Sequence, residues 1–402
     1  MSETQPDRTD RPAGVGEIPV ALFIRGIFFL LLVSGVVVSA HWYIGLRLIR
    51  DAQWPAAVQP VLWGVLWAGF GSIFAGFLGG RLLPRKVAGI AQWVGFIWMG
   101  MFGLLLTSSG ASDLAFFIAG KLSEKGPEWG RAQALMVAAL ALPALVWGFY
   151  VARRTPIVER VTVPIKGLGK AFEGLRIVQI TDIHIGETLD HRFLRRVVDQ
   201  VNALNPDIVA VTGDAIDGPV TKLRDETLGF GGLKAKRGVF YVTGNHEYYH
   251  GAAAWIAEMK RLGLRPLINE HVVLEEGGDQ LAVGGVPDLE GARFSESHRP
   301  QVDAAFAGAP PAEKAPRILL AHQPLFAKRA GGQGVQLMLS GHTHGGQIFP
   351  FMFLVRLQQP VIAGLRELWG VPVYTSRGTG YWGPPFRVGP SSEITEITLK
   401  AA

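Results

Sequence analysis

The sequence predicts two structural parts: a region of four membrane-spanning helices and a water-soluble α/β domain. Residues 18–151 carry few charges and contain four long apolar segments. The chain after residue 154 instead has short β-rich runs, with helical patterns between some of them. We therefore expect a polar, disordered N-terminus at 1–17, a transmembrane region at 18–154 and the soluble domain at 155–402.

The four apolar segments are each long enough to cross a bilayer, which takes about 20 mostly apolar residues. They span about 26–44, 57–79, 87–107 and 132–151. The first lacks a convincing small-residue cleavage site, so we interpret it as a retained helix rather than a signal peptide. A further apolar stretch, Ala111–Gly120, is too short to span, and we expect it in a loop or at the interface.

Basic residues near the helix ends predict the orientation, because cytoplasmic loops carry an excess of Lys and Arg. The side that holds both termini has Arg8, Arg11, Arg25, Arg81, Arg85, Lys86, Arg153 and Arg154, and the other side has Arg47, Arg50, Lys121, Lys125 and Arg131. This modest excess favours a cytoplasmic soluble domain, in what we expect to be a bacterial inner membrane. The opposite orientation stays open.

The composition narrows the possible partners. The net charge is +6, but no long Lys/Arg run is interleaved with aromatic residues, so we expect a lipid bilayer and no nucleic acid as partner. The sequence contains no cysteine, which excludes disulfides, thiolate metal sites and a cysteine nucleophile.

Five apolar runs of the soluble domain each end within three residues of a side chain that can bind a metal. The runs are Leu175–Ile180, Asp207–Val211, Gly238–Val242, Arg317–Leu320 and Val335–Leu339, and helical patterns at Arg192–Leu204 and Ala252–Leu262 lie between some of them. The side chains that follow are Asp182, His184, Asp214, Asp217, Asn245, His246, His322, His342 and His344. Because ligands bind beyond the carboxyl ends of strands in α/β sheets, we expect these side chains to converge.

Oxygen and imidazole ligands suit Mn, Fe, Zn or similar divalent ions. Two such ions about 3.5–4 Å apart can activate a water molecule and hold the attacking and leaving oxygens of a phosphoryl group. Two close cations need a carboxylate between them, and Asp214 is the candidate. The residues therefore predict a site for two divalent metal ions.

The motifs Asp-x-His, Gly-Asp-x-x-Asp, Gly-Asn-His-Glu, His and Gly-His-x-His follow one another from Asp182 to His344. In this order they resemble the calcineurin-like metallophosphoesterase superfamily. The resemblance implies a metal-dependent hydrolase of phosphate esters or anhydrides, with two β-sheets packed together and flanked by helices.

The resemblance also implies a role for each motif residue. It assigns Asp182, His184 and His344 to the first metal, Asn245, His322 and His342 to the second, and Asp214 to a bridge between them. It makes His246 the general acid, and Asp217 the partner that orients its ring.

Two further features concern the substrate. Gly218 stands where the phosphoprotein phosphatases of this superfamily have a phosphate-binding Arg, which argues against a phosphoprotein. The stretches Gly341–Gln347 and Gly378–Arg387 resemble the membrane-associated branch that includes the UDP-diacylglucosamine pyrophosphatases. We therefore expect hydrolysis of a phosphodiester or pyrophosphate bond in a lipid or lipid-linked substrate, with manganese a candidate metal. Glu393–Leu399 is expected to form a closing edge strand after a loop beside the site.

Other interpretations of the same residues stay open. The site could bind a phosphorylated ligand without catalysis, as a sensor or scaffold, although no ligand position is lost. A nuclease of the same superfamily is another alternative, although the sequence lacks a basic and aromatic groove. Near the motifs, we expect Glu247 to support a turn, and Arg377 either to contact phosphate or to be a solvated surface residue.

Overall fold

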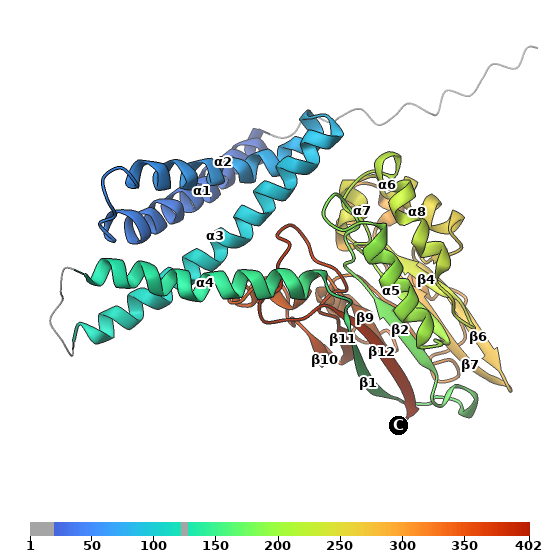
Figure 1. The fold of residues 1–402 in the computed structure, drawn as a ribbon. Coiled ribbons are helices and arrows are strands. Elements are labelled where there is room, and N and C mark those ends of the chain that lie inside the picture. The colour runs from blue at the N-terminus through green and yellow to red at the C-terminus, as the bar shows by residue number, and fades with distance from the viewer. Residues whose placement is uncertain (1–19, 122–127) are drawn as a thin grey trace, which may run out of the picture.

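The computed structural model describes residues 20–121 and 128–402, and shows a bundle of long helices joined to an α/β domain (Figure 1). The predicted disordered segment 1–17 lies outside the described residues. The division into apolar helices followed by two flanked β-sheets confirms the predicted fold class.

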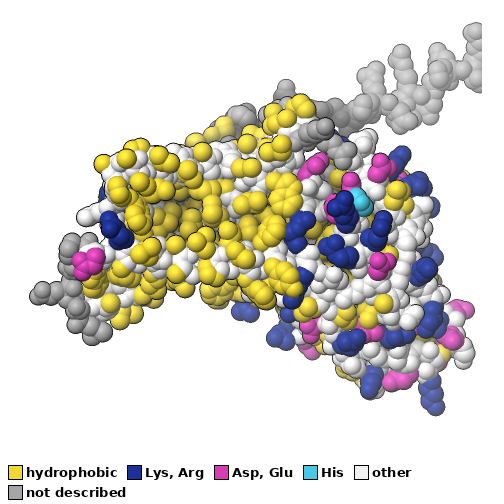
Figure 2. All heavy atoms as spheres, viewed as in Figure 1, with side chains coloured by type: hydrophobic (Ala, Val, Ile, Leu, Met, Phe, Trp, Pro, Cys, Tyr) yellow, Lys and Arg dark blue, Asp and Glu magenta, His cyan; other side chains and the backbone are white. Residues whose placement is uncertain are grey.

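Within the described residues, four helices are long and apolar enough, by length and composition, to cross a membrane. They are α1 (Val20–Gly45), which continues into a π-helical turn η1 (Leu46–Arg50), α2 (Gln59–Leu82), α3 (Arg85–Ala119) and α4 (Trp129–Arg153). Large apolar side chains such as Leu31, Val61 and Ile90 are more than half exposed, which is expected where helices face lipid. On the face shown in Figure 2, hydrophobic side chains predominate over these helices.

Ala111–Gly120 is expected in a loop or at the interface, and the loop is wrong because these residues continue a helix. Helix α3 runs without a break from Arg85 to Ala119, a length of 35 residues. No proline interrupts this stretch, so the backbone hydrogen bonds of the helix continue to its end at Ala119. The helix is therefore longer than the stretch of about 20 residues that spans about 30 Å.

The soluble domain contains two six-stranded sheets. The first has the order β1 (Ile157–Ile165), β12 (Glu393–Ala401), β2 (Arg176–Ile180), β3 (Ile208–Thr212), β4 (Val239–Val242), β5 (Arg265–Pro266). The second has the order β10 (Gly364–Leu368), β11 (Val371–Thr375), β9 (Val335–Ser340), β8 (Arg317–Leu320), β7 (Asp279–Gly285), β6 (Glu270–Glu276). The pairs β2–β3, β3–β4 and β8–β9 are parallel, so their carboxyl ends lie at one side of the domain.

The main core lies between the sheets, where Ile177 and Ile208 of the first sheet share one buried cluster with Ile318 and Leu337 of the second. The outer face of the first sheet is covered by α5 (His191–Ala203) and α8 (Ala252–Arg261), which bury Phe193 and Trp255. The short helices α9 (Val302–Ala305) and α10 (Ala327–Ala330) cover the second sheet. Central strands buried on both faces explain the continuous apolar runs in the sequence.

The remaining elements are short. They are η2 (Lys170–Phe172), α6 (Val220–Thr227), η3 (Leu228–Gly232), α7 (Asn245–Tyr249), η4 (Leu289–Arg293), η5 (Glu296–His298), η6 (Pro324–Phe326), η7 (His344–Gly346) and α11 (Met352–Val355).

The C-terminal strand is not at the edge of its sheet. Strand β12 pairs in parallel with β1 and antiparallel with β2, so β1 is the edge strand and the predicted position of Glu393–Leu399 is wrong. Strand β1 follows directly on helix α4, and it therefore joins the membrane region to the sheet that carries the first motifs.

The membrane helices also contact the loop before β12. The backbone N–H of Arg387 donates to the carbonyl of Gly148 in α4, at 2.9 Å. Phe386 packs in an apolar cluster with Leu104 of α3 and Ala141 of α4. A Cβ on Gly100 of α3 would lie 2.3 Å from the Phe386 ring, so the glycine leaves room for this contact.

Candidate metal centre

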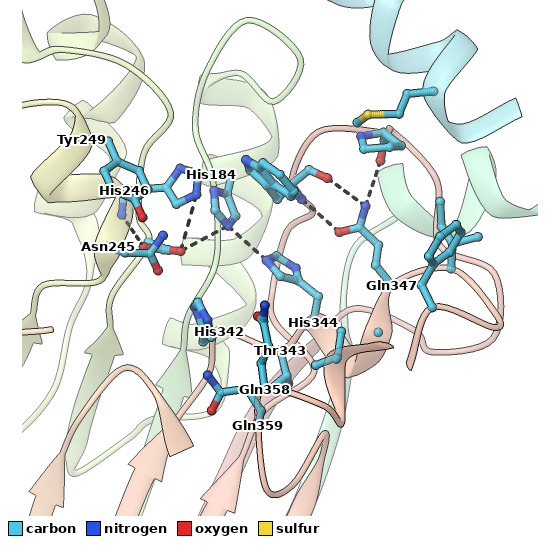
Figure 3. A pocket seen from close by; sticks show the side chains of 18 residues that line it. His184, Asn245, His246, Tyr249, His342, Thr343, His344, Gln347, Gln358 and Gln359 are labelled. Atoms are coloured by element: carbon cyan, nitrogen blue, oxygen red, sulfur yellow. Dashed lines mark hydrogen bonds and ion pairs between the residues drawn. The ribbon is translucent and has the colours of Figure 1, made fainter. Parts of the chain in front are cut away.

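The predicted side chains converge where the five strands end. Asp182 and His184 follow β2, Asp214 and Asp217 follow β3, and Asn245 and His246 follow β4. The second sheet contributes His322 after β8, and His342 and His344 after β9. In Figure 3, side chains from both sheets point toward one another at a common pocket.

Three groups of these side chains have the spacing of metal ligands. They are Asp182, His184 and His344; Asp214, His322 and His342; and His184, Asp217 and His246. Within each group, the candidate ligand atoms lie within 4.8 Å of one another. The Nε2 atoms of His184 and His344 are 3.1 Å apart, and His342 Nδ1 is 3.2 Å from His322 Nε2.

Asp214 lies between the first two groups. Its Oδ2 atom is 3.2 Å from His322 Nε2 in one group and 3.8 Å from His184 Nε2 in the other. The same oxygen is 3.9 Å from His246 Nε2. This central position is the one that a bridging carboxylate requires.

Asn245 supplies the observation that best tests whether a cation fits. Its side-chain Oδ1 is buried and has no hydrogen-bond partner among the described residues. A buried oxygen without a partner is costly, whereas an oxygen that coordinates a cation is satisfied. The donor set therefore fits a divalent metal, and Asn245 adds an oxygen to the histidines and carboxylates around it.

Asp217 contacts two histidines through one carboxylate oxygen. Its Oδ1 lies 2.6 Å from His246 Nδ1 and 2.9 Å from His184 Nδ1. The sequence predicts the first of these contacts but not the second. Since Nδ1 of each ring is held by this carboxylate, Nε2 of each ring is directed toward the Asp214 oxygen.

The backbone at these residues adopts a conformation that side chains disfavour. Asp182, His184, Asp214, His342 and His344 all have φ between 50° and 70°. Non-glycine residues in this left-handed region store strain, which clusters at functional sites and persists when the surroundings enforce it.

Glu247 is one of the groups that enforce this conformation. Its buried carboxylate accepts hydrogen bonds from the backbone N–H groups of Gly244, Asp214 and Ala215, at 2.6, 3.0 and 2.8 Å. These contacts confirm the predicted role of Glu247 as a support for the turn. The neighbouring Gly213 has a φ of +92°, and a Cβ there would lie 2.7 Å from His322 Nδ1.

The electrostatics reflect the burial of several charges together. Burial alone would lower the pKa of His246, but Asp214 and Asp217 raise it to about 9. Burial would raise the pKa of Asp217, but His184 and His246 hold it well below its usual value. Burial and the nearby His322 lower the pKa of His342 to about 3. His342 is therefore neutral near pH 7, as a metal-binding imidazole must be.

Comparison with known proteins agrees with this geometry. Residues 175–346 match the family model for calcineurin-like phosphoesterases. An "Uncharacterized metallophosphoesterase" of Helicobacter pylori is 39% identical over 263 residues, which cover 65% of this chain and 68% of that protein. The chain belongs to the calcineurin-like phosphoesterase family.

A second relative combines this family's domain with a membrane part. The zebrafish "Transmembrane protein with metallophosphoesterase domain" is 39% identical over 276 residues, or 66% of this chain and 63% of that protein. The chain thus spans less than two thirds of that relative. Among solved structures, Haemophilus influenzae NAD nucleotidase is 19% identical and covers 52% of this chain and 50% of its own, with a TM-score of 0.36. The family and the four apolar helices together identify a membrane protein with a metallophosphoesterase domain.

A cavity of about 540 Å³ lies over the phosphoesterase site. Its polar lining includes His184, Asp214, Asn245, His246, His342 and His344. Its apolar lining includes Met99 of α3, Ile348, Phe351, Val355 and Pro384. The sequence did not predict Met99 there, because nothing in an apolar helix marks which side chain reaches a distant domain.

Two arginines of this region are held by polar contacts. Arg377 is not among the residues that line the cavity, and its guanidinium pairs with Glu393 and Glu159 rather than being free in solvent. Arg387, which the sequence did not single out, is fully buried and donates to the carbonyls of Gly380 and His344. Its Nη2 lies 3.3 Å from His344 Nδ1, so the loop that contacts α4 also supports a residue of the candidate metal centre.

Proposed function

We propose that this phosphoesterase hydrolyses a phosphodiester or pyrophosphate bond in a lipid or lipid-linked substrate. One observation carries the proposal: the Asp, Asn and His cluster and a set of apolar side chains, among them Met99 of helix α3, line the same cavity. A phosphorylated lipid has a matching polar head and apolar body. Gln347 and Pro384, which line the cavity, belong to the two stretches that resemble the membrane-associated branch.

The proposed roles follow from the contacts. Asp182, His184 and His344 would hold one divalent cation, and Asn245, His322 and His342 a second, with Asp214 shared. Bound cations would lower the pKa of a water molecule and offset the negative charge of the phosphate.

His246 is the proposed general acid. It lines the cavity beside the proposed metal ligands, and in the metal-free protein Asp214 and Asp217 raise its pKa to about 9, so the ring is placed to donate a proton to the leaving oxygen. Asp217 is a positioning residue, because it contacts Nδ1 and leaves Nε2 directed toward the cluster.

Two variants test the catalytic roles with manganese and a phosphodiester that has an alkyl leaving group, because an alkoxide needs a proton whereas nitrophenolate leaves without one. We expect His246→Ala to lower kcat about 100-fold or more on this substrate, which is the usual contribution of a general acid. Asp214→Asn should also abolish most turnover, by reducing cation binding. The control is His271→Ala, because His271 lies on β6 and binds the carbonyl of Ala305. Full turnover by both site variants would refute the assignment. Absence of turnover in the wild type would favour a ligand-binding sensor.

The substrate class needs a separate experiment. Lipid extracts of a strain that lacks the gene should accumulate the phosphodiester or pyrophosphate lipid that this domain consumes. An unchanged phospholipid profile, together with accumulation of a soluble phosphoester, would overturn the lipid assignment and leave the hydrolase intact.

The proposed location is a bacterial inner membrane with the domain in the cytoplasm, supported by the excess of Lys and Arg on the side that carries both termini. Because the chain has no cysteine, one introduced at Glu275 on β6 reports the side directly. An impermeant maleimide should label it only after the cells are opened, and labelling of intact spheroplasts would reverse the orientation.

A further inference from the structure

One segment beside the cavity exposes large apolar side chains. We call Ile348–Gln358, which includes helix α11, the rim segment. Its residues Phe349, Phe353, Leu354 and Leu357 are 53%, 62%, 59% and 81% exposed. A soluble surface rarely gathers so many large apolar groups, and such patches mark sites of protein or membrane interaction.

The rim segment is held in place at both ends, although its apolar side chains are exposed. At one end, the backbone N–H of Phe349 donates to the carbonyl of Val388, at 2.8 Å. Just beyond the other end, the side chain of Gln359 is buried, donates to Gln323 and accepts from the backbone N–H of Leu325. Since both ends are tied to the domain, the apolar groups between them are presented in a fixed position.

The rim segment is continuous with the membrane helices. Ile348 and Phe351 share an apolar cluster with Leu104 of α3 and Ala141 of α4. A Cβ on Gly103 of α3 would lie 3.0 Å from the Phe351 ring, which shows how closely the segment approaches the helix. In Figure 1, the orange chain around residue 350 lies beside α3 and α4. The rim segment therefore lies directly against the membrane helices.

The same segment borders the cavity. Phe351, Val355 and Gln358 line it, whereas Phe353, Leu354 and Leu357 do not. The segment thus has an inner side toward the candidate metal centre and an outer apolar side. Arg356, exposed between Val355 and Leu357, adds the basic group that often lies at headgroup level in interfacial helices.

We propose that the outer side of the rim segment inserts into the adjacent leaflet of the bilayer that α1–α4 span, and that a phosphorylated lipid passes over it into the cavity. The second half of this inference rests on the proposed lipid substrate. The first half does not, because insertion depends only on the exposed apolar groups and the neighbouring helices. A free apolar patch of this size beside membrane helices gains free energy when its side chains leave water.

Insertion can be measured without any substrate. The full-length chain has no cysteine, so Phe353→Cys and Leu357→Cys each give one site for a nitroxide label in proteoliposomes of phosphatidylethanolamine and phosphatidylglycerol. We expect both labels to be accessible to oxygen and protected from a water-soluble nickel complex. Glu275→Cys, on β6 at the far side of the domain from the helices in Figure 1, should show the reverse.

Two results would overturn insertion. Access of the nickel complex to positions 353 and 357 equal to that at 275 would place the segment in water. Spin–spin broadening at 353 between copies would assign the surface to a second molecule of this chain.

The proposed passage of a lipid over the rim segment into the cavity is tested by enzyme activity. The double variant Phe353→Ser/Leu357→Ser should cleave bis-nitrophenyl phosphate within twofold of the wild type, because neither side chain lines the cavity. Its turnover of the accumulating lipid in vesicles should fall at least tenfold. Leu228→Ser, at a leucine that is 51% exposed outside the rim segment, is the matched control.

An equal loss of turnover with both substrates, or no loss with the lipid, would overturn the proposed route of the lipid. A wild type that cleaves only the soluble ester would refute the lipid function and leave the labelling result standing.

Discussion

His246 Nδ1 lies 2.6 Å from Oδ1 of Asp217, and the same oxygen lies 2.9 Å from His184 Nδ1. One carboxylate therefore orients both the proposed general acid and a proposed metal ligand. Because each ring is held at Nδ1, the Nε2 atom of each is left for chemistry. This arrangement makes Asp217 a sensitive test of the site, although it is not a metal ligand in our proposal.

We expect Asp217→Asn to lower kcat for bis-nitrophenyl phosphate about 10- to 100-fold, which is typical for the loss of a group that orients an imidazole. The amide keeps the volume but removes the negative charge that fixes both rings. Asp225→Asn, at an exposed position in α6, is the control and should keep full activity. Wild-type kcat in the Asp217 variant would show that the rings are positioned without it.

The same pair predicts how the stability of the metal-free protein depends on pH. The pKa of His246 is raised from 6.5 to about 9, so the stability that this shift contributes is complete below pH 6.5 and is lost as the pH rises through 9. The pKa of Asp217 is lowered, so its contribution is present above pH 3.8 and is lost on acidification. The difference in Tm between wild type and Asp217→Asn should therefore be largest between about pH 4 and 6.5.

Thermal unfolding in detergent with a chelator measures this difference, which should shrink as the pH approaches 9. The control is the same substitution in a His246→Ala background, where the decline between pH 6.5 and 9 should disappear. A constant Tm difference across that range in both backgrounds would contradict the assigned pKa of His246.

Much of this site was predictable because its residues follow strand ends. The parallel strands β2, β3 and β4 end on the same side, so a side chain two or three residues beyond each end reaches the same place. His322 and His342 follow the second sheet by the same rule. Local order in the sequence was therefore enough to predict which side chains converge.

Other parts of the fold and of the site depend on contacts between distant segments, which leave no local pattern in the sequence. Arg387 is buried because backbone carbonyls surround its guanidinium, whereas an arginine in a Gly- and Pro-rich stretch normally indicates a surface loop. The position of β12 depends on β1, which precedes the first motif and carries no motif itself. Met99 lines the cavity only because α3 passes beside the domain. In each case, packing between distant segments decided the outcome.

The proposed pair of cations predicts different metal contents for different carboxylate variants. Wild-type protein saturated with manganese should hold two ions per chain. Asp182→Asn should retain about one, because Asp182 belongs to one ligand group only. Asp214→Asn should retain fewer, because its Oδ2 lies near His322 of one group and His184 of the other.

Elemental analysis of purified protein by mass spectrometry gives these ratios directly. Asp279→Asn is the control, because that carboxylate binds the backbone N–H of Ala171 outside the site. Equal metal content in the Asp182 and Asp214 variants would contradict the shared position of Asp214, and a single ion in the wild type would contradict the proposed pair.

The contact between α3 and the domain gives the last prediction. A Cβ on Gly100 would lie 2.3 Å from the buried ring of Phe386 and 3.2 Å from Pro384. A Cβ on Gly110, in the same helix, would meet no other described residue within 4 Å beyond the backbone of its own turn. Both Gly→Ala changes should favour the helix by about 1 kcal/mol through backbone propensity, so their difference isolates the effect of crowding.

We expect Gly100→Ala to be less stable than Gly110→Ala by about 1–3 kcal/mol, the usual cost of overpacking a buried contact. Turnover should also fall in Gly100→Ala alone, because Phe386 precedes Arg387, whose guanidinium contacts His344. Thermal unfolding and bis-nitrophenyl phosphate hydrolysis in the same detergent measure the two effects. If both variants match in Tm and in kcat, the membrane helices do not position this side of the candidate metal centre. If only Gly100→Ala loses both, the bundle supports the site through Phe386 and Arg387 as well as anchoring it.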